Sequence, residues 1–303
     1  MLNLVTITGS SGFVGQNLTK YLSDRGDSIS KLSLRNQNWK NNMELKSDAI
    51  IHLAGKAHDT SNTSGEEEYF KINRDLTIDL YDKFIKSEIK DFFYFSSVKA
   101  VADKVDGILK EDVIGYPITP YGKSKLEAEQ YLLSQTLPTG KRLFIIRPCM
   151  IHGPGNKGNL NLLYNVVKKG FPWPLASFHN QRSFLSIDNL SFLVKEMMNT
   201  QEMQSDIYNF SDDEPISTNG LVNLIAQTLD KKPRFLHIPA SFIKAVGKIG
   251  DVIPLPLNSE RLKKLTESYV VSNDKIKNAL GIQYLPTSAE EGLKKTILSF
   301  KRL

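Results

Sequence analysis

Two residues with acid–base chemistry, Tyr121 and Lys125, lie four positions apart at the start of a predicted helix over residues 121–135. Residues at that spacing share one face of a helix. An unperturbed phenol has a pKa near ~10, and a neighbouring ammonium lowers it. We therefore predict that Tyr121 exchanges a proton with a substrate hydroxyl or carbonyl near neutral pH.

A third polar group is expected at the same substrate oxygen. Ser96 and Ser97 close the predicted strand 92–96, and in a parallel sheet that end faces the ligand crevice. A tyrosine and a lysine at this spacing are common by themselves. The prediction of catalysis therefore depends on their combination with the strand-end serines and with a glycine-rich turn.

That turn follows the predicted strand 2–8 and places three glycines at spacing three, Gly9, Gly12 and Gly15. The first permits a tight turn, the second lets the backbone approach a pyrophosphate, and the third allows close packing of helix on sheet. The N–H groups that begin the next helix suit phosphate. We predict a dinucleotide site in which the turn also contributes Ser11, Phe13 and Val14.

The predicted second strand, residues 28–34, decides between NAD and NADP. A carboxylate at its end would bind the ribose 2′-hydroxyl of NAD, whereas an arginine suits the 2′-phosphate of NADP. Here Arg35 and Asn36 follow the strand, and no carboxylate stands there. The sequence slightly favours NADP over NAD. In the alternative, Arg35 is solvated and the selectivity is loose.

Strands and helices that alternate along the first half of the chain predict a parallel sheet covered on both faces, a Rossmann-type doubly wound α/β fold. A long helix over 66–88 carries apolar residues at spacing four, and further strands are predicted at 48–54 and 143–147. After residue 148 we expect one more strand, 207–210, and short helices at 218–229, 240–249, 259–266, 273–280 and 288–300. We predict a dinucleotide-binding domain (1–148 plus about 183–211) and a smaller mixed substrate domain (about 149–182 plus 212–303).

Composition narrows the class of protein. The 303 residues are 40% hydrophobic and 24% charged, an ordinary globular balance. One cysteine, Cys149, excludes an intramolecular disulfide, and we predict a cytoplasmic protein. We expect no metal site, because the five histidines lack ligand spacing. We expect neither a membrane segment nor contact with a membrane, because no apolar run approaches the ~20 residues of a membrane helix. The net charge is +6, without runs of like charge, so a nucleic-acid partner is not expected.

These motifs together resemble the extended short-chain dehydrogenases/reductases, the nucleotide-sugar epimerase/dehydratase group, over nearly the whole chain. The resemblance rests on TGSSGFVG at 8–15, HLAG at 52–55 and YGKSK at 121–125. It implies that Ser97, Tyr121 and Lys125 are catalytic and that Lys125 also binds the nicotinamide ribose. It further implies cofactor contacts from Leu53, Ala54, Gly55, Asn73 and Ser96.

The resemblance also implies a substrate site. The segment around Arg182 is similar to the one whose arginine binds the nucleotide diphosphate, and guanidinium groups bind phosphate in a bidentate manner. Asn159, at the start of a helix, is expected to reach the diphosphate or the sugar, and Arg261 is a further candidate for phosphate. Arg147 and the segment 152–155 resemble the family's RP…YGPG region.

Within the group, the chain is most similar to UDP-hexose 4-epimerases and to reductases of UDP-4-keto-N-acetylhexosamines from surface-polysaccharide synthesis. The NADP-type strand end favours 4-keto reduction of a UDP-sugar, with UDP-hexose 4-epimerisation as the alternative. A non-catalytic dinucleotide sensor is more remote, since it would not need all three catalytic residues. The resemblance also predicts a homodimer formed by helices 66–88 and 121–135.

Three departures from the family pattern carry information. Asp48 follows Arg35 by only 13 positions, so the usual third strand cannot fit in full, and Glu44 and Leu45 are at best a remnant of it. Val98 and Lys99 stand where dehydratases have an Asp-Glu pair, so we exclude dehydration. His152 replaces a tyrosine and is interpreted as a packing or hydrogen-bonding substitution.

Overall fold

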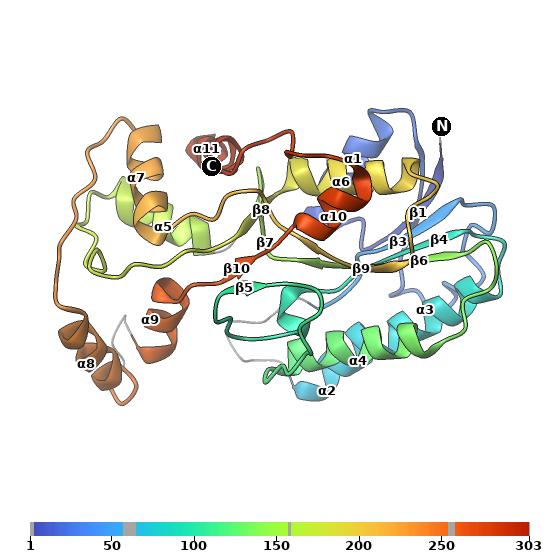
Figure 1. Ribbon diagram of the computed structural model, residues 1–303, viewed down its shortest axis with the longest axis horizontal. Helices are drawn as coiled ribbons and strands as arrows, with labels where there is room; N and C mark the ends of the chain where they lie inside the picture. Colours follow the sequence, from blue (N-terminus) through green and yellow to red (C-terminus); the bar gives the residue numbers. More distant parts are fainter. Residues whose placement is uncertain (1–2, 57–64, 157–158, 254–257, 303) are drawn as a thin grey trace.

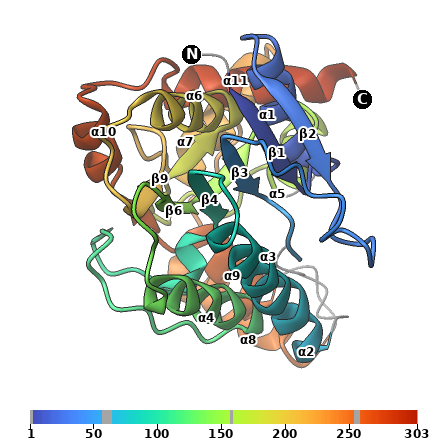
Figure 2. The same ribbon diagram turned by 90° about the vertical axis from the view of Figure 1, so that its right-hand side faces the viewer.

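The computed structural model describes residues 3–56, 65–156, 159–253 and 258–302. Its centre is a six-stranded parallel sheet in the order β2-β1-β3-β4-β6-β9 (Figures 1 and 2). The strands are β1 (Leu4–Thr8), β2 (Ser28–Leu32), β3 (Ala49–His52), β4 (Asp91–Phe95), β6 (Arg142–Pro148) and β9 (Asp206–Phe210). All residues of β3 and β4 are buried, as expected for parallel strands covered on both faces.

Helices cover both faces of this sheet. Helices α1 (Phe13–Ser23) and α6 (Ile187–Asn199) pack together on one face, and α3 (Leu76–Ile85) and α4 (Pro120–Ser134) lie on the other (Figure 2). Successive strand residues enter opposite cores, because side chains alternate along a strand. Phe93 joins the core with α1 and α6, whereas Phe92 joins the core with α3 and α4. The predicted doubly wound α/β fold is confirmed.

Strand β2 is the edge of the sheet, and the described residues between it and β3 form turns. Trp39 and Met43 from this connection are buried and pack in the core beside α3. The prediction that the connection is too short for a third strand is confirmed. Two large side chains cover this margin of the core instead.

The long helix predicted over 66–88 is broken into three parts. Helix α2 (Glu66–Tyr69) leads into a π-helical turn, η1 (Phe70–Asp75), and then into α3. The wider turn changes which side chains face inward: Asn73 and Thr77 are fully buried, whereas Ile72 and Leu76 are only half-buried. The predicted apolar stripe is therefore wrong for Ile72 and Leu76, and it holds for Leu80 and Phe84, which are buried. The π turn directs a polar residue inward, as such turns often do at functional sites.

A second group of helices forms a smaller lobe with its own core at the other end of the molecule (Figure 1). We define this lobe by α5 (Asn159–Lys168), α7 (Thr218–Thr228), α8 (Ala240–Gly250), α9 (Ser259–Thr266) and α11 (Ala289–Ser299). These four C-terminal helices and α10 (Asp274–Leu280), which contacts β9, begin and end within one residue of their predicted bounds. No helix in the described ranges is both long and apolar enough to cross a bilayer.

Helix α6 and four short strands were not predicted. The strands are β5 (Ile108–Leu109), β7 (Met150–His152), β8 (Phe184–Ser186) and β10 (Val270–Val271), each too short to show a pattern. Helix α6 is buried around most of its circumference, including polar residues such as Asn189 and Lys195. Its apolar residues Ile187, Leu190, Val194 and Met197 nevertheless recur at spacings of three and four, a signal from which the helix could have been predicted.

Candidate active site

Strand β4 and helix α4 bring the predicted catalytic residues together. Ser97 follows the carboxyl end of β4, and Tyr121 is the second residue of α4. The start of α4 is fixed by Pro120 and by Thr119, whose hydroxyl accepts a hydrogen bond from the Gly122 N–H at 3.2 Å. The side chains of Ser97 and Tyr121 are hydrogen-bonded to each other. The first two members of the trio can therefore address one substrate oxygen.

The pKa of Tyr121 differs from the sequence-based expectation. Burial raises the pKa of Tyr121, the hydrogen bond with Ser97 opposes that rise, and Tyr69 adds to it. The rings of Tyr69 and Tyr121 meet edge to face with centroids 6.3 Å apart. The expected lowering by Lys125 is not found, because burial dominates. In this structure Tyr121 is held as a phenol, the form that donates a proton.

Lys125 lies buried one helical turn beyond Tyr121. Its Nζ donates a hydrogen bond to the Phe95 carbonyl at 2.8 Å, which ties α4 to the end of β4. Burial lowers the pKa of Lys125 to about 8, and Glu129 opposes that shift. A Cβ at Gly55 would lie 3.3 Å from this Nζ and 3.0 Å from the amide oxygen of Asn73. The glycine that ends the HLAG motif therefore leaves space beside both polar groups.

Asn73 is held by three hydrogen bonds from the π-helical turn. Its Oδ1 accepts from the Lys56 N–H at 2.7 Å, and its Nδ2 donates to the Lys56 carbonyl and to the Ser124 hydroxyl, both at 3.1 Å. Ser124 lies between Tyr121 and Lys125 on α4. Asn73 therefore joins the segment after β3 to the catalytic helix, which places it in the site as predicted.

A hydrogen-bonded chain through His52 runs beneath this site. The Ala54 N–H donates to Thr8 Oγ1 at 3.1 Å, and Thr8 Oγ1 lies 2.7 Å from His52 Nδ1. On the other side, His52 Nε2 lies 2.9 Å from Thr77 Oγ1, which donates to the Asn73 carbonyl at 2.8 Å. Since Thr77 donates to that carbonyl, it accepts from His52 Nε2, and His52 Nδ1 accepts from Thr8.

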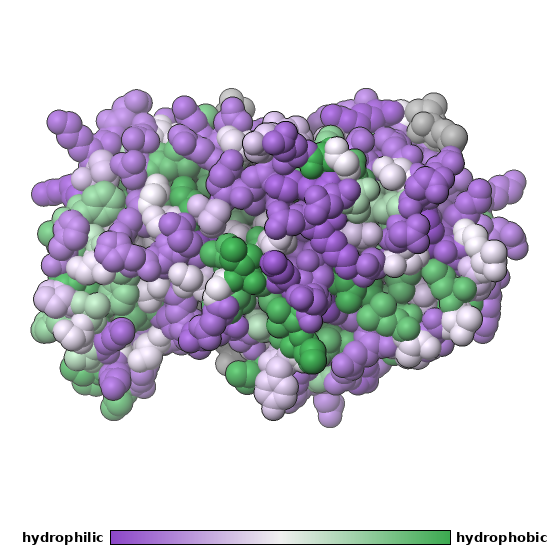
Figure 3. All heavy atoms as spheres, viewed as in Figure 1, coloured by the Kyte–Doolittle hydropathy of each residue, from purple (hydrophilic) through white to green (hydrophobic). Residues whose placement is uncertain are grey.

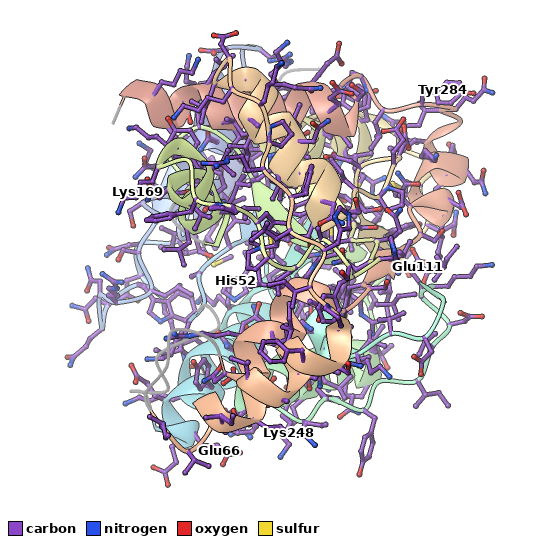
Figure 4. All side chains as sticks on the ribbon, turned by 90° about the vertical axis from the view of Figure 1, so that its left-hand side faces the viewer. His52, Glu66, Glu111, Lys169, Lys248 and Tyr284 are labelled. Carbon is purple, nitrogen blue, oxygen red and sulfur yellow. The ribbon has the colours of Figure 1, made fainter. Side chains whose placement is uncertain are left out.

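His52 is neutral in this chain. Burial, and secondarily Lys125, lower the pKa of His52 to about 3. Figure 4 shows His52 within the molecule, away from its outer surface. Its role as a link between the glycine turn and Asn73 was missed, although the motif HLAG contains it. Sequence spacing gives no sign that Thr8 and Thr77 meet the two ring nitrogens.

A buried ion pair fixes the second half of the catalytic helix. Arg147 on β6 donates from Nε and Nη2 to both carboxylate oxygens of Glu129 on α4, with distances of 3.0, 3.2 and 2.5 Å. Both side chains are at most 5% exposed. Glu129 was missed as a site residue. Its position four residues after Lys125, on the same helical face, is the signal that could have identified it.

The glycine turn has the geometry that a dinucleotide requires. Gly9 has a φ of +68°, and a Cβ there would lie 2.6 Å from the Ala54 nitrogen. A Cβ at Gly15 would lie 2.3 Å from the Gly9 carbonyl, so the helix packs closely on the turn itself. No side chain caps α1 at Gly12, and Ser11 and Gly12 are exposed. These observations fit a pyrophosphate at the start of α1.

Other predicted cofactor residues line the same edge of the sheet. Leu53 and Ala54 follow β3, and both are partly exposed. The buried hydroxyl of Ser96 has no hydrogen-bond partner among the described residues, an orphan group that a cofactor would satisfy. Phe13 and Val14 are half-buried in the first turn of α1. Arg35 is exposed beyond β2. The preference for NADP over NAD that Arg35 indicates stays a prediction.

Two cations, Arg182 and Lys99, lie close enough to interact electrostatically, and Lys99 Nζ donates a hydrogen bond to the Asp103 carbonyl at 2.8 Å. Arg182 is half-buried in an extended segment that pairs with Ile216 and Tyr269. Burial lowers the pKa of Arg182. Lys99 follows Ser97 by two residues, and burial, with a contribution from Arg182, lowers its pKa to about 8. Lys99 Nζ lies 4.3 Å from the centre of the Tyr269 ring. The two cations suit an anionic group next to Ser97.

The remaining predicted substrate residues are less informative. The side chain of Asn159 lies outside the described part of the structure. Arg261 is exposed on α9. His152 is buried and its Nδ1 bonds Thr296 Oγ1 at 2.9 Å, with Nε2 3.5 Å from Asp212. His152 thus connects β7 to α11, which agrees with its interpretation as a hydrogen-bonding substitution.

Comparison with known proteins agrees with this geometry. The model of the NAD dependent epimerase/dehydratase family matches residues 5–210. A UDP-glucose 4-epimerase from Vibrio cholerae is 30% identical, across 98% of this chain and 95% of its own. An N-acetyl-α-D-glucosaminyl-diphospho-ditrans,octacis-undecaprenol 4-epimerase from Escherichia coli O157:H7 is 27% identical, across 90% and 84%. The solved UDP-N-acetylglucosamine 4-epimerase from Bacillus cereus aligns with a TM-score of 0.78 at 18% identity, across 99% of each chain.

Proposed function

The chain belongs to the NAD-dependent epimerase/dehydratase family of enzymes, and from this premise we propose that it inverts C4 of a UDP-linked hexose. The observation that carries the proposal is the hydrogen-bonded pair of Ser97 and Tyr121 above buried Lys125. This arrangement suits removal of a hydroxyl proton from a secondary alcohol and its later return. The nicotinamide, when bound, supplies hydride transfer at the same carbon.

The chain's own groups divide the remaining work. Tyr121 receives the proton of the 4-hydroxyl once it is ionised and returns that proton as the phenol, and Ser97 hydrogen-bonds the same oxygen. Lys125 supplies positive charge beneath Tyr121 and Ser97. Asn73 and Glu129 hold α4, the helix that carries Tyr121 and Lys125. Arg182 binds the diphosphate and thereby presents C4 to the pair. The turn shaped by Gly9, Gly12 and Gly15 would hold the pyrophosphate of the dinucleotide, with Gly12 as the point of close approach.

Of the two reactions that the sequence leaves open, we favour epimerisation. Two relatives that match at least 90% of this chain are 4-epimerases by name. Reduction is supported by Arg35, which suits a dissociable NADPH. Incubation with UDP-glucose, UDP-N-acetylglucosamine or a 4-keto sugar, followed by chromatography of the products, separates them. Epimerisation produces the C4 epimer with no net change in nicotinamide absorbance, whereas reduction consumes one NADPH for each product.

A lipid-linked hexose is a second candidate substrate. The diphosphate of such a sugar would meet the same cations, Lys99 and Arg182. The name of the relative from Escherichia coli O157:H7 gives a polyprenyl diphosphate sugar as its substrate. The specific observation in its favour is the apolar surface of α8, where Phe242 and Ile249 are exposed. Parallel assays with UDP-N-acetylglucosamine and with its polyprenyl diphosphate counterpart decide between the two carriers.

We also propose a homodimer formed by α3 and α4. Leu133 on α4 is 53% exposed, so an apolar contact is available there. Two polar residues of the same segment are engaged within the chain: Tyr69 contacts Tyr121, and Asp82 accepts from the Tyr131 hydroxyl at 2.8 Å. Light scattering tests the proposal, and a mass near the 34.1 kDa of one chain would contradict it.

A further inference from the structure

Helix α8 exposes large apolar side chains at the outer end of the lobe. Phe242 is 62% exposed and Ile249 is 51% exposed, and in the turn that follows the helix Val252 and Ile253 are 87% and 54% exposed. Figure 3 shows hydrophobic surface over this part of the lobe, next to hydrophilic surface. Scattered exposed apolar residues are ordinary, but four on one short segment indicate an interaction surface.

The exposed residues form a stripe distinct from the face by which α8 packs. The packed face is narrow: Ile243 is buried, and a Cβ at Gly247 would lie 3.4 Å from the Leu262 side chain on α9. Phe242 and Ile249 recur at a spacing of seven, so they share the other side of the helix, and Val252 and Ile253 follow in the turn after it. We call Phe242, Ile249, Val252 and Ile253 the outer stripe. A surface helix usually has one apolar face, which packs on the core. Helix α8 has a second apolar face, and this one is exposed to solvent.

Positive charge is concentrated in the sequence segment that contains the outer stripe, between Asp230 and Glu267. Residues 231–264 contain eight Lys or Arg (231, 232, 234, 244, 248, 261, 263 and 264) and two acids, Asp251 and Glu260. Their net charge is 8 − 2 = +6, equal to that of the whole chain. Lys244 and Lys248 are exposed on α8 itself, and Figure 4 shows Lys248 at the outer end of the molecule. The partner of this surface must therefore be both apolar and anionic.

We propose that α8 docks this protein on the surface of an anionic lipid bilayer, with the outer stripe inserted among the acyl chains and Lys244 and Lys248 at the headgroups. Helices with an apolar stripe beside basic residues lie in the membrane interface in this way. Anionic lipid attracts such lysines, and the attraction falls with added salt. A bilayer satisfies both the apolar and the cationic character, whereas water satisfies only the second.

A second copy of the chain is a poorer occupant. Two-fold association through α8 would place each strongly cationic segment against its copy, which is repulsive. The expectation of no membrane contact considered only segments that cross a bilayer. A helix that lies on the surface needs no such length. The proposal depends on the surface of α8 and not on the substrate, so membrane docking and the proposed C4 chemistry can fail independently.

Vesicle sedimentation with the full-length protein tests the inference. The expected result is binding to vesicles of phosphatidylglycerol and phosphatidylethanolamine, weakened by salt, and little binding to phosphatidylcholine alone. The double variant Ile249→Ser/Val252→Ser should lower the partition coefficient on the order of 100-fold. Lys244→Gln/Lys248→Gln should lower it about fivefold for each lysine. Both pairs of side chains are exposed, so folding should be unaffected, which circular dichroism checks.

Matched variants on the opposite part of the molecule serve as controls. Leu45→Ser removes an apolar side chain of similar exposure, and Lys71→Gln/Lys90→Gln removes two exposed lysines outside α8. Both should bind vesicles like the parent protein. Equal binding by the parent and the outer-stripe variant would overturn the proposal, since adsorption would then be by charge alone. Absence of parent binding at low salt would also overturn it, as would a change of oligomeric state in the outer-stripe variant.

Discussion

Charged side chains are placed differently in two regions of the molecule, the part around the sheet and the helical lobe. Around the sheet, charged side chains are buried in pairs: Arg147 with Glu129, and Lys195 with both oxygens of Asp27 at 2.7 and 2.8 Å. In the lobe, Lys244 and Lys248 lie exposed beside apolar side chains that are also exposed. The first arrangement fixes positions, and the second offers a surface.

Buried ion pairs are weak sources of stability, because desolvation of both charges offsets their attraction. Their value around the sheet is therefore geometric. Glu129 and Arg147 join α4 to β6, and the Lys125 bond to the Phe95 carbonyl joins α4 to β4. Together they hold the helix that carries Tyr121 against two strands. The comparison suggests that chemistry is confined to the rigid part, while the lobe controls what is presented to it.

The largest expected effect comes from removing the proton-transfer group. Tyr121→Phe should lower kcat by about 10²–10⁴-fold with little change in stability, because only the hydroxyl beside Ser97 is lost. Tyr131→Phe on the same helix is the control, since its hydroxyl binds Asp82 at the outer surface. Steady-state kinetics on the established substrate provide the measurement. Activity of Tyr121→Phe within twofold of the parent would exclude this role.

The next effect tests whether buried pairs hold the rigid part together. Glu129→Gln leaves the Arg147 charge buried without its partner and should cost about 3–5 kcal/mol of unfolding free energy. Glu127→Gln, on the same helix, breaks a partly exposed pair with Arg74 and should cost about 0–1 kcal/mol. Urea denaturation compares the two. Similar losses for both variants would mean that burial of the pair is unimportant.

The double change Glu129→Met/Arg147→Met separates geometry from charge. Replacing a whole buried pair by apolar residues is often neutral for stability. We expect this variant to regain most of the stability that Glu129→Gln loses. We also expect kcat to remain lowered, because the bidentate orientation of α4 is gone. Full recovery of both quantities would show that the pair does not position the catalytic helix.

The sequence predicted the sheet and most helices because their signals are local. Runs such as residues 48–54 and the glycine turn need no knowledge of distant partners. Asn73 could be placed only by resemblance, since the π turn that directs it inward leaves no mark in the apolar spacing. Ser97, Tyr121 and Lys125 were identified together because two motifs of fixed order carry them.

Other site features depend on contacts between distant segments. His52 meets Thr8 and Thr77 across 44 and 25 positions, and Arg147 meets Glu129 across 18. The lowered pKa of Tyr121 was expected from spacing alone, and burial reverses it. Spacing describes which residues can share a face. It does not describe how much water reaches them, and that decides the direction of a pKa shift.

A smaller effect compares two arginines of the substrate side. Arg182→Ala should weaken UDP binding by about 10- to 150-fold, since hydrogen bonds to charged groups contribute about 1.5–3 kcal/mol, and it should leave dinucleotide affinity unchanged. Arg261→Ala should weaken UDP binding less, because Arg261 is exposed on α9 whereas Arg182 is half-buried. Calorimetric titration of UDP measures both. Equal affinities of the parent and Arg182→Ala would show that Arg182 is structural.

The smallest effect concerns the free energy of unfolding that is lost because the ammonium group of Lys125 is buried. Burial lowers the pKa of Lys125 to about 8 in the folded protein. An unfolded lysine has a pKa of about 10.4. Between these values the unfolded chain binds a proton that the folded protein does not, so the free energy of unfolding rises with pH.

The rise contributed by Lys125 is at most about 1.4 kcal/mol per pH unit, or about 2 kcal/mol between pH 8 and about 9.5. Lys125→Met should remove that contribution. Lys99, whose pKa is also lowered to about 8, contributes a slope of the same sign to both proteins and cancels in their difference. Urea denaturation at several pH values, stopped below the range in which tyrosines titrate, measures the difference. Parallel pH profiles would mean that Lys125 keeps an ordinary lysine pKa in the folded protein, so that its position on the catalytic helix costs no stability.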